Sequence, residues 1–152
     1  YVHLLAGYVA AASFAAVTLV WVRKMLPEKG DREWLMHLGG YLGAKGHFPA
    51  GKFNAGQKIL FWMALVMMAV LVVTGLIMGL CSGQRFAMQS VVYTIHDIAG
   101  LGMILLLLGH IYLGVCVNPH SVRTIFGGIV SSIWAKRHHP NWEPVADLPD
   151  PD

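Results

Sequence analysis

Charged residues are scarce in this chain. Asp, Glu, Lys and Arg together make up 12% of the 152 residues, whereas ordinary soluble domains carry roughly 25%. Hydrophobic residues make up 56%, and the mean hydropathy is +0.57. This composition argues against a soluble domain and predicts a membrane protein.

Cysteine is nearly absent as well, because Cys81 and Cys116 are the only two. They form no CxxC or CxxCH motif and lack the spacing of a zinc site, which argues against covalently attached haem and zinc fingers. We expect no structural disulfide either. The net charge of +3 comes from short basic clusters beside apolar runs, not from one continuous stripe, so we expect no nucleic-acid partner.

Three long uncharged runs, residues 4–22, 59–80 and 98–117, account for the high hydropathy. About 20 helical residues cross the hydrocarbon core of a bilayer, and a helix satisfies its own backbone hydrogen bonds there. The sequence therefore predicts an all-α membrane protein, a transmembrane helix bundle with three spans. Residues 31–38 and 126–137 have the pattern of short interfacial helices.

Basic residues are distributed unequally among the connections, and this bias predicts the orientation. The first link and the tail hold Arg23, Lys24, Lys29, Arg32, Lys45, Lys52, Lys58, Arg123, Lys136 and Arg137. The link 81–97 holds only Arg85. We therefore expect a multi-pass protein with loop 23–58 and the C-terminus on the cytoplasmic side and loop 81–97 on the outer side. Since Tyr1 then starts outside, we expect a fourth, N-terminal span ahead of it.

His96, just before the third run, and His110, within it, have the spacing of ligands for two stacked haems. Fourteen residues in a helix correspond to about 21 Å of rise and nearly four turns, so both rings face the same side. The alternative is an interfacial histidine and a packing histidine, but ionisable residues within spans mark functional sites by default. The distance excludes a single metal ion bound by both.

His3 is the expected partner of His96, because runs one and three both begin on the outer side and place these residues at equal depth. Two imidazoles on opposite faces of one haem iron are typical of electron transfer. The other histidines on the side of His110 are His37, His47, His120, His138 and His139, all in connections. We expect the partner of His110 to come instead from the upstream helix. Small residues near the ligands, such as Gly7 and Gly100, suit the flat faces of a porphyrin, although they are also common at membrane helix contacts.

Several segments resemble the gamma subunits of respiratory formate dehydrogenases. Residues 52–58 read Lys-Phe-Asn-Ala-Gly-Gln-Lys and run into Phe61 and Trp62, and residues 134–140 read Trp-Ala-Lys-Arg-His-His-Pro. Together with the helix carrying His96 and His110, the resemblance covers nearly the whole chain. It implies a four-helix cytochrome b with two haems b, in which His3 and His96 bind the outer haem and His110 binds the inner one.

The resemblance also implies the location, the partners and the function. The location is a bacterial inner membrane, so loop 81–97 would lie in the periplasm. The partners are an iron-sulfur (beta) subunit and a molybdenum or tungsten catalytic (alpha) subunit. Electrons pass from the iron-sulfur subunit through both haems to menaquinone or ubiquinone at the cytoplasmic side, so the chain carries the quinone-reducing end of a formate:quinone oxidoreductase and does not oxidise formate. Asn54, Gly56, Gln57 and His110 are the predicted quinone pocket. Alternatively, Asn54 only caps the second helix.

Residues 1–139 are thus expected to form a transmembrane di-haem cytochrome b domain, and residues 140–152 a Pro-rich cytoplasmic tail. Two other functions stay open. The first is a cytochrome b subunit of another quinone-linked complex, such as a nickel-iron hydrogenase or a thiosulfate-type reductase, which the co-purifying catalytic subunit would identify. The second is a haem-free membrane anchor or transporter component, which the spectrum of the reduced protein would distinguish.

Overall fold

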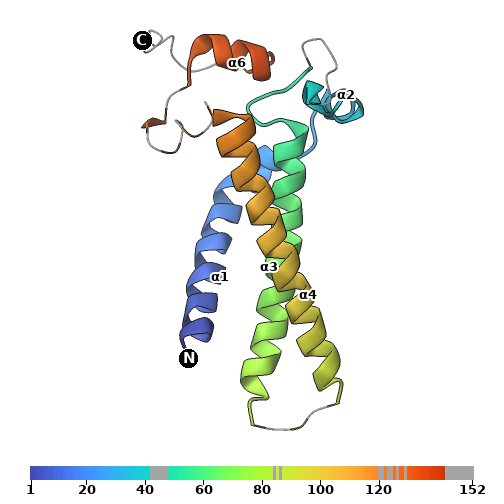
Figure 1. The fold of residues 1–152 in the computed structure, drawn as a ribbon, viewed down its shortest axis with the longest axis vertical. Coiled ribbons are helices and arrows are strands. Elements are labelled where there is room, and N and C mark those ends of the chain that lie inside the picture. The colour runs from blue at the N-terminus through green and yellow to red at the C-terminus, as the bar shows by residue number, and fades with distance from the viewer. Residues whose placement is uncertain are drawn as a thin grey trace. The chain divides into compact units, whose positions relative to one another are not determined.

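The computed structural model describes residues 1–41, 48–83, 85, 87–119, 122, 125, 127–128 and 130–142. Every regular element within these ranges is helical (Figure 1), which confirms the all-α prediction. Several residues considered above lie outside them: Lys45, His47, His120, Arg123, Phe126 and residues 143–152 of the predicted tail.

Among the described residues, three helices are long and apolar enough to cross a membrane: α1 (Val2–Trp21), α3 (Ala55–Leu80) and α4 (Gln89–Tyr112). Their large apolar side chains point outward to an unusual degree; Leu105 is 60% exposed and Ile98 66% exposed. Such surfaces are unfavourable in water but suit contact with lipid or with other membrane helices. The chain is therefore a helical membrane protein with several spans.

The start of α4 differs from the prediction. The helix begins at Gln89 and not at residue 98, so the link between α3 and α4 covers residues 81–88 and not 81–97. The prediction followed the uncharged run and therefore stopped at Asp97. The helix continues through the partly polar residues 89–97 because its backbone hydrogen bonds are formed within the helix, such as the bond from Val92 N to Met88 O at 3.0 Å. The Thr94 hydroxyl also donates to the Ser90 carbonyl at 2.9 Å.

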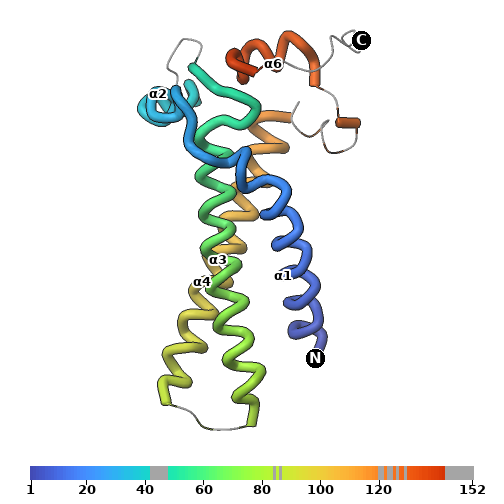
Figure 2. Tube along the Cα trace, turned by 180° about the vertical axis from the view of Figure 1, so that it is seen from behind, coloured from blue at the N-terminus to red at the C-terminus, as the bar shows by residue number. Residues whose placement is uncertain are grey.

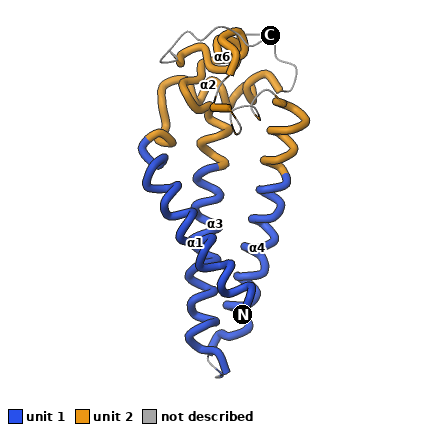
Figure 3. Tube along the Cα trace, turned by 90° about the vertical axis from the view of Figure 1, so that its left-hand side faces the viewer, with its two compact units in different colours: residues 1–23, 61–108 blue, residues 24–60, 109–152 orange. Residues whose placement is uncertain are grey.

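The chain divides into two compact units, coloured separately in Figure 3. Unit 1 comprises Tyr1–Arg23 and Phe61–Leu108, and unit 2 comprises Lys24–Leu60 and Gly109–Asp152. The predicted domain boundary between residues 139 and 140 concerns a different division and stays a prediction.

Within unit 1, α3 and α4 lie side by side in both views of the trace (Figures 1 and 2). Small residues make the close approach possible. A Cβ atom added to Gly102 would lie 2.8 Å from the sulfur of Met67, and one added to Gly79 would lie 3.9 Å from a methyl group of Leu4. Glycine contacts of this kind are common between membrane helices, and here they bring α1, α3 and α4 together.

Unit 2 contains short helices around a small aromatic core. These are α2 (Asp31–Met36), η2 (Leu38–Gly40), the π-helical turn η3 (Leu113–Val117) and α6 (Ser132–His138), while η1 (Val22–Met25) connects the units. Trp34, Ala50 and Ala55 are buried together, with Phe48 against them. The two predicted short helices are found in part: α2 lies within the predicted residues 31–38, and α6 overlaps the second half of the predicted residues 126–137 and ends one residue later. Phe126 lies outside the described residues.

A buried lysine ties α2 to the start of α3 in unit 2. The Nζ atom of Lys58 lies 3.0 Å from a carboxylate oxygen of Asp31 and 3.1 Å from one of Glu28. The Lys58 side chain is 6% exposed, against 16% for Asp31 and 56% for Glu28. A buried ammonium is stable only with such partners, so this lysine fixes the fold of the loop in addition to contributing to the charge bias.

The C-terminal segment of unit 2 is held by His139. Its Nδ1 lies 2.7 Å from the Gly51 carbonyl oxygen, and the backbone N–H of Asn141 donates to the Ala50 carbonyl. The ring contacts Trp134 and Trp142, with centroid distances of 5.3 and 6.3 Å. Burial lowers the pKa of His139, although the bond to Gly51 acts in the opposite direction and the nearby His138 lowers it further. The neutral ring therefore suits this site.

Candidate cofactor sites

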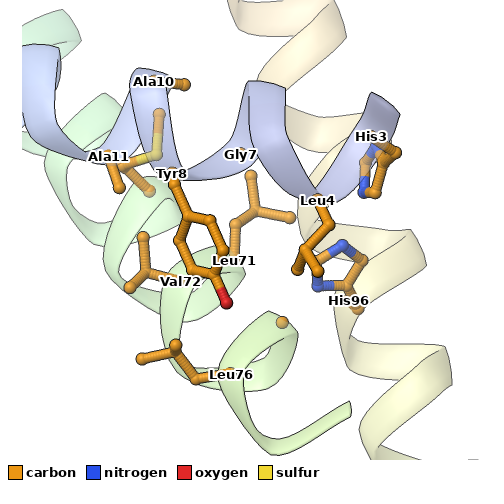
Figure 4. Close-up of a pocket in the computed structure, with 12 residues that line it drawn as sticks. His3, Leu4, Gly7, Tyr8, Ala10, Ala11, Leu71, Val72, Leu76 and His96 are labelled. Atoms are coloured by element: carbon orange, nitrogen blue, oxygen red, sulfur yellow. The ribbon is translucent and has the colours of Figure 1, made fainter. Parts of the chain in front are cut away.

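The structure brings His3 and His96 together within unit 1. His3 lies in the first turn of α1 and His96 in the second turn of α4, and their ring centroids are 6.1 Å apart with the ring planes at 80° (Figure 4). The proximity expected from equal depth is therefore found. Ligation itself stays a prediction.

This separation fits one metal atom between the two rings. Metal–imidazole bonds are about 2.0 Å long in protein sites. The centre of a five-membered ring with bonds of about 1.33 Å lies about 1.1 Å behind the coordinating nitrogen. Two imidazoles that both bound one metal atom would therefore have centroids no more than about 6.2 Å apart, and the observed 6.1 Å would allow His3 and His96 to hold one iron.

An apolar cleft adjoins the histidine pair. Its wall is formed by side chains of α1 and α3 together with both histidines, as Figure 4 shows: Leu4, Tyr8, Leu71, Val72 and Leu76 are among them. Gly7 also lines the cleft, and a Cβ atom added there would meet no atom within 4 Å. An apolar cleft beside two imidazoles would suit a porphyrin whose iron these imidazoles held.

Two residues of α3 that lie close to His96 were not predicted from the sequence. Gly75 borders the cleft, and a Cβ atom added there would lie 3.5 Å from Cε1 of His96. Thr74 is 7% exposed, and its hydroxyl oxygen lies 2.8 Å from Nδ1 of His96. Thr74 carries a hydroxyl within an otherwise apolar span, and this feature of the sequence could have indicated its contact with His96.

His110 lies near the end of α4 and belongs to unit 2. Its ring is exposed, and no hydrogen bond, ion pair or ring contact to it occurs among the described residues. The other histidines described in unit 2 have structural roles. His37 bonds to the Glu33 carbonyl and stacks on Phe48, and His138 bonds to the Trp134 carbonyl and stacks on its ring.

The start of α3 forms a reciprocal capping box. The backbone N–H of Gln57 donates to Oδ1 of Asn54 at 2.9 Å, and the backbone N–H of Asn54 donates to Oε1 of Gln57 at 2.9 Å. The Asn54 carbonyl accepts the first helical bond, from Lys58, so Asn54 is the N-cap. A Cβ atom added to Gly56 would lie 2.8 Å from the Trp34 ring, which gives this glycine a packing role.

The cap residue also borders a polar recess of unit 2. The recess is lined by Trp34, Gly39, Gly40, Tyr41, Phe48, Asn54, Arg137 and His138. The capping box uses the amide oxygens of Asn54 and Gln57, whereas an amide NH₂ group is a separate donor. The capping role and a role in ligand binding are therefore compatible for these two side chains.

Comparison with known proteins places the chain in a family. The family model of prokaryotic cytochrome b561 matches residues 1–128. The cytochrome b556(Fdn) subunit of the nitrate-inducible formate dehydrogenase of Escherichia coli is 38% identical over 148 residues, covering 92% of this chain and 68% of that protein. The cytochrome b556 subunit of a formate dehydrogenase of Haemophilus influenzae is 32% identical over 149 residues, covering 93% and 61% respectively. The chain belongs to the prokaryotic cytochrome b561 family, and within it to the gamma-type cytochrome b subunits of formate dehydrogenases, transmembrane proteins of electron transport.

Proposed function

We propose that this chain carries electrons from an iron-sulfur subunit to quinone in a membrane-bound formate dehydrogenase, and that it holds two haems b for this purpose. The single observation that carries the proposal is the His3–His96 pair, whose centroid separation of 6.1 Å suits two axial ligands of one iron. Haem b with two protein ligands supplies reversible one-electron transfer without an open coordination position.

The protein's contribution at this site is to hold and shield the cofactor. His3 and His96 would be the axial ligands, each fixed on a separate helix. The apolar cleft wall of leucine, valine and tyrosine side chains excludes water from one edge of the group, and burial is one of the means by which proteins set a haem potential. Gly7 leaves the space that any larger residue would fill.

His110 is the proposed ligand of the second haem, fourteen residues further along α4. The expectation that an additional N-terminal helix supplies the opposite ligand stays a prediction. An imidazole on an apolar helix without a bonded partner among the described residues supports the assignment, because ionisable groups in spans are costly unless they serve a purpose.

The proposed quinone pocket comprises Asn54, Gly56, Gln57 and His110. Quinone carbonyls need hydrogen-bond donors, and the amide NH₂ groups of Asn54 and Gln57 are candidates because the capping box engages only their oxygens. The polar recess beside Asn54, with Arg137 and Tyr41 in its wall, supports a ligand-binding function at this end of α3. Gly56 acts here by admitting the Trp34 ring.

The finer cellular arrangement belongs to the same proposal. We place loop 23–58 and the C-terminus in the cytoplasm, the α3–α4 link in the periplasm, and the protein in a bacterial inner membrane. The partners are the iron-sulfur subunit and a molybdenum or tungsten catalytic subunit, and the acceptor is menaquinone or ubiquinone. The names of the relatives, which are formate dehydrogenase subunits, support the choice of complex.

The proposal is tested on the purified membrane complex. Subunits that co-purify are identified, and haem absorption is followed after formate is added and again after a soluble quinone analogue is added. We expect reduction of b-type haem by formate and reoxidation by the quinone. Haem that formate leaves oxidised while hydrogen or another donor reduces it would assign the chain to a different quinone-linked complex.

A further inference from the structure

The Thr74 hydroxyl sits between a carbonyl of its own helix and the ring of His96. Its oxygen lies 2.6 Å from the Val70 carbonyl oxygen and 2.8 Å from Nδ1 of His96. A hydroxyl has one proton to donate and two lone pairs that accept. Donation to the carbonyl four residues back is the usual bond of a threonine within a helix, and the short distance to Val70 assigns the proton to that bond.

The contact with His96 then has a fixed direction. With the threonine proton directed at the Val70 carbonyl, the complementary arrangement has the ring donating its Nδ1–H to the hydroxyl oxygen. A neutral imidazole with its proton on Nδ1 has a free lone pair on Nε2. The hydroxyl therefore selects the tautomer in which Nε2 is able to bind a metal, and it also fixes the rotation of the ring.

We propose that Thr74 is a positioning residue for the haem held by His3 and His96, and that its hydrogen bond lowers the reduction potential of that haem. This inference rests on the proposed function, since it takes His96 to be a ligand. A hydrogen bond from the distal ring nitrogen makes the coordinating nitrogen more basic. A more basic ligand stabilises the oxidised iron more than the reduced iron, and hydrogen bonding around the ligands is one of the factors that set haem potentials.

The chain offers variants matched to this inference. Thr74→Val has nearly the same shape but no hydroxyl, and Thr74→Ser restores the hydroxyl without the methyl group. Thr18 provides the control on α1, because its hydroxyl also donates to a carbonyl four residues back, that of Phe14 at 2.8 Å, and it has no bond to a histidine among the described residues. Thr18→Val should therefore behave as wild type.

The experiment is a potentiometric titration of haem absorption in the intact complex, with haem counted in each variant. His96→Ala first identifies which one-electron step belongs to the His3–His96 haem. In Thr74→Val we expect the ratio of reduced to oxidised haem at that step to rise by up to about tenfold at fixed ambient potential, equivalent to about 59 mV for one electron. The second step should not move, and Thr74→Ser should return the first step toward wild type.

The outcomes separate the two proposals. If Thr74→Val loses the haem while Thr74→Ser and Thr18→Val keep it, the hydroxyl is needed to hold His96 and the inference stands. If His96→Ala removes one haem but Thr74→Val keeps both haems with wild-type potentials, the Thr74 inference is overturned and the ligand assignment survives. If His96→Ala keeps both haems, the ligand assignment fails and the Thr74 inference fails with it.

Discussion

Replacing Asn54 by Asp separates the structural role of this residue from its proposed role in quinone binding. The capping box needs the side-chain oxygen that accepts the Gln57 N–H at 2.9 Å, and a carboxylate supplies that acceptor equally well. The substitution removes the NH₂ donor that would face the quinone and adds a negative charge at the helix N-terminus. Asn54→Ala, in contrast, removes both the acceptor and the donor.

The two variants differ in their expected magnitudes. Loss of an N-cap costs about 0.5–2 kcal/mol, so Asn54→Ala should lower the stability of the complex by that amount. Asn54→Asp should leave stability unchanged or slightly higher, since a negative charge at a helix N-terminus is favourable by about 0.3–1 kcal/mol. Loss of one neutral hydrogen bond to the quinone, about 0.5–1.5 kcal/mol, should weaken quinone affinity by about twofold to tenfold in both variants.

The assay measures the rate at which formate-reduced haem is reoxidised as the concentration of a quinone analogue is varied, together with the thermal midpoint of each variant. Gln57→Glu is the matched variant on the other half of the box. Quinone affinity that falls only in Asn54→Ala, in step with the loss of stability, would show that Asn54 acts as a cap alone and would refute the proposed pocket.

Three further predictions concern the ion pair, the C-terminal histidine and the cleft. Lys58→Met should destabilise the protein by about 3 kcal/mol in thermal unfolding. This is the low end for breaking a buried ion pair, because Glu28 is more than half exposed. The double variant Lys58→Met/Asp31→Asn should recover part of this loss, and a double variant no more stable than Lys58→Met would contradict the account. Since burial lowers the pKa of His139, the unfolded chain binds more protons than the folded chain between the folded pKa and about pH 6.5. The stability that His139 contributes should therefore be complete above about pH 6.5 and be lost as the pH falls through the folded pKa. Unfolding can be followed by tryptophan fluorescence, because Trp134 and Trp142 contact the His139 ring. His139→Asn should abolish this pH dependence, and a pH dependence that persists in the variant would show that another group causes it. Gly7→Phe should fill the cleft and remove one haem without unfolding the helices, because no atom lies within 4 Å of a Cβ atom added at Gly7. Circular dichroism measures the helix content and absorption measures the haem content of the variant. Full haem content would place the cofactor elsewhere.

The spans and the His3–His96 pairing could be predicted because they depend on length and direction alone. A run of about 20 uncharged residues must cross the bilayer as a helix, and two helices that enter from one side place equally deep residues together. The start of α4 at Gln89 could not be predicted this way, since hydropathy does not register a helix that continues through polar residues with satisfied backbone bonds.

The contacts of Thr74 and Lys58 depend on features that hydropathy does not determine. The rotation of α3 about its own axis decides whether Thr74 faces His96 or lipid, and this rotation is set by interhelical packing. Lys58 counts as one more basic residue in a topology argument, yet its buried ammonium contacts two carboxylates 27 and 30 residues earlier in the chain, those of Asp31 in α2 and Glu28 before it. The capping box, in contrast, is visible in the sequence as Asn54 followed three residues later by Gln57.

The central claim, that His3 and His96 hold the same haem, is tested most directly by counting haem in the purified complex of the wild type, His3→Ala, His96→Ala and the double variant. Two ligands of one iron act as a unit, so we predict two haems per chain in the wild type and one in each of the three variants. Two haems in either single variant would contradict the claim. So would a double variant with no haem, because the two histidines would then serve different haems.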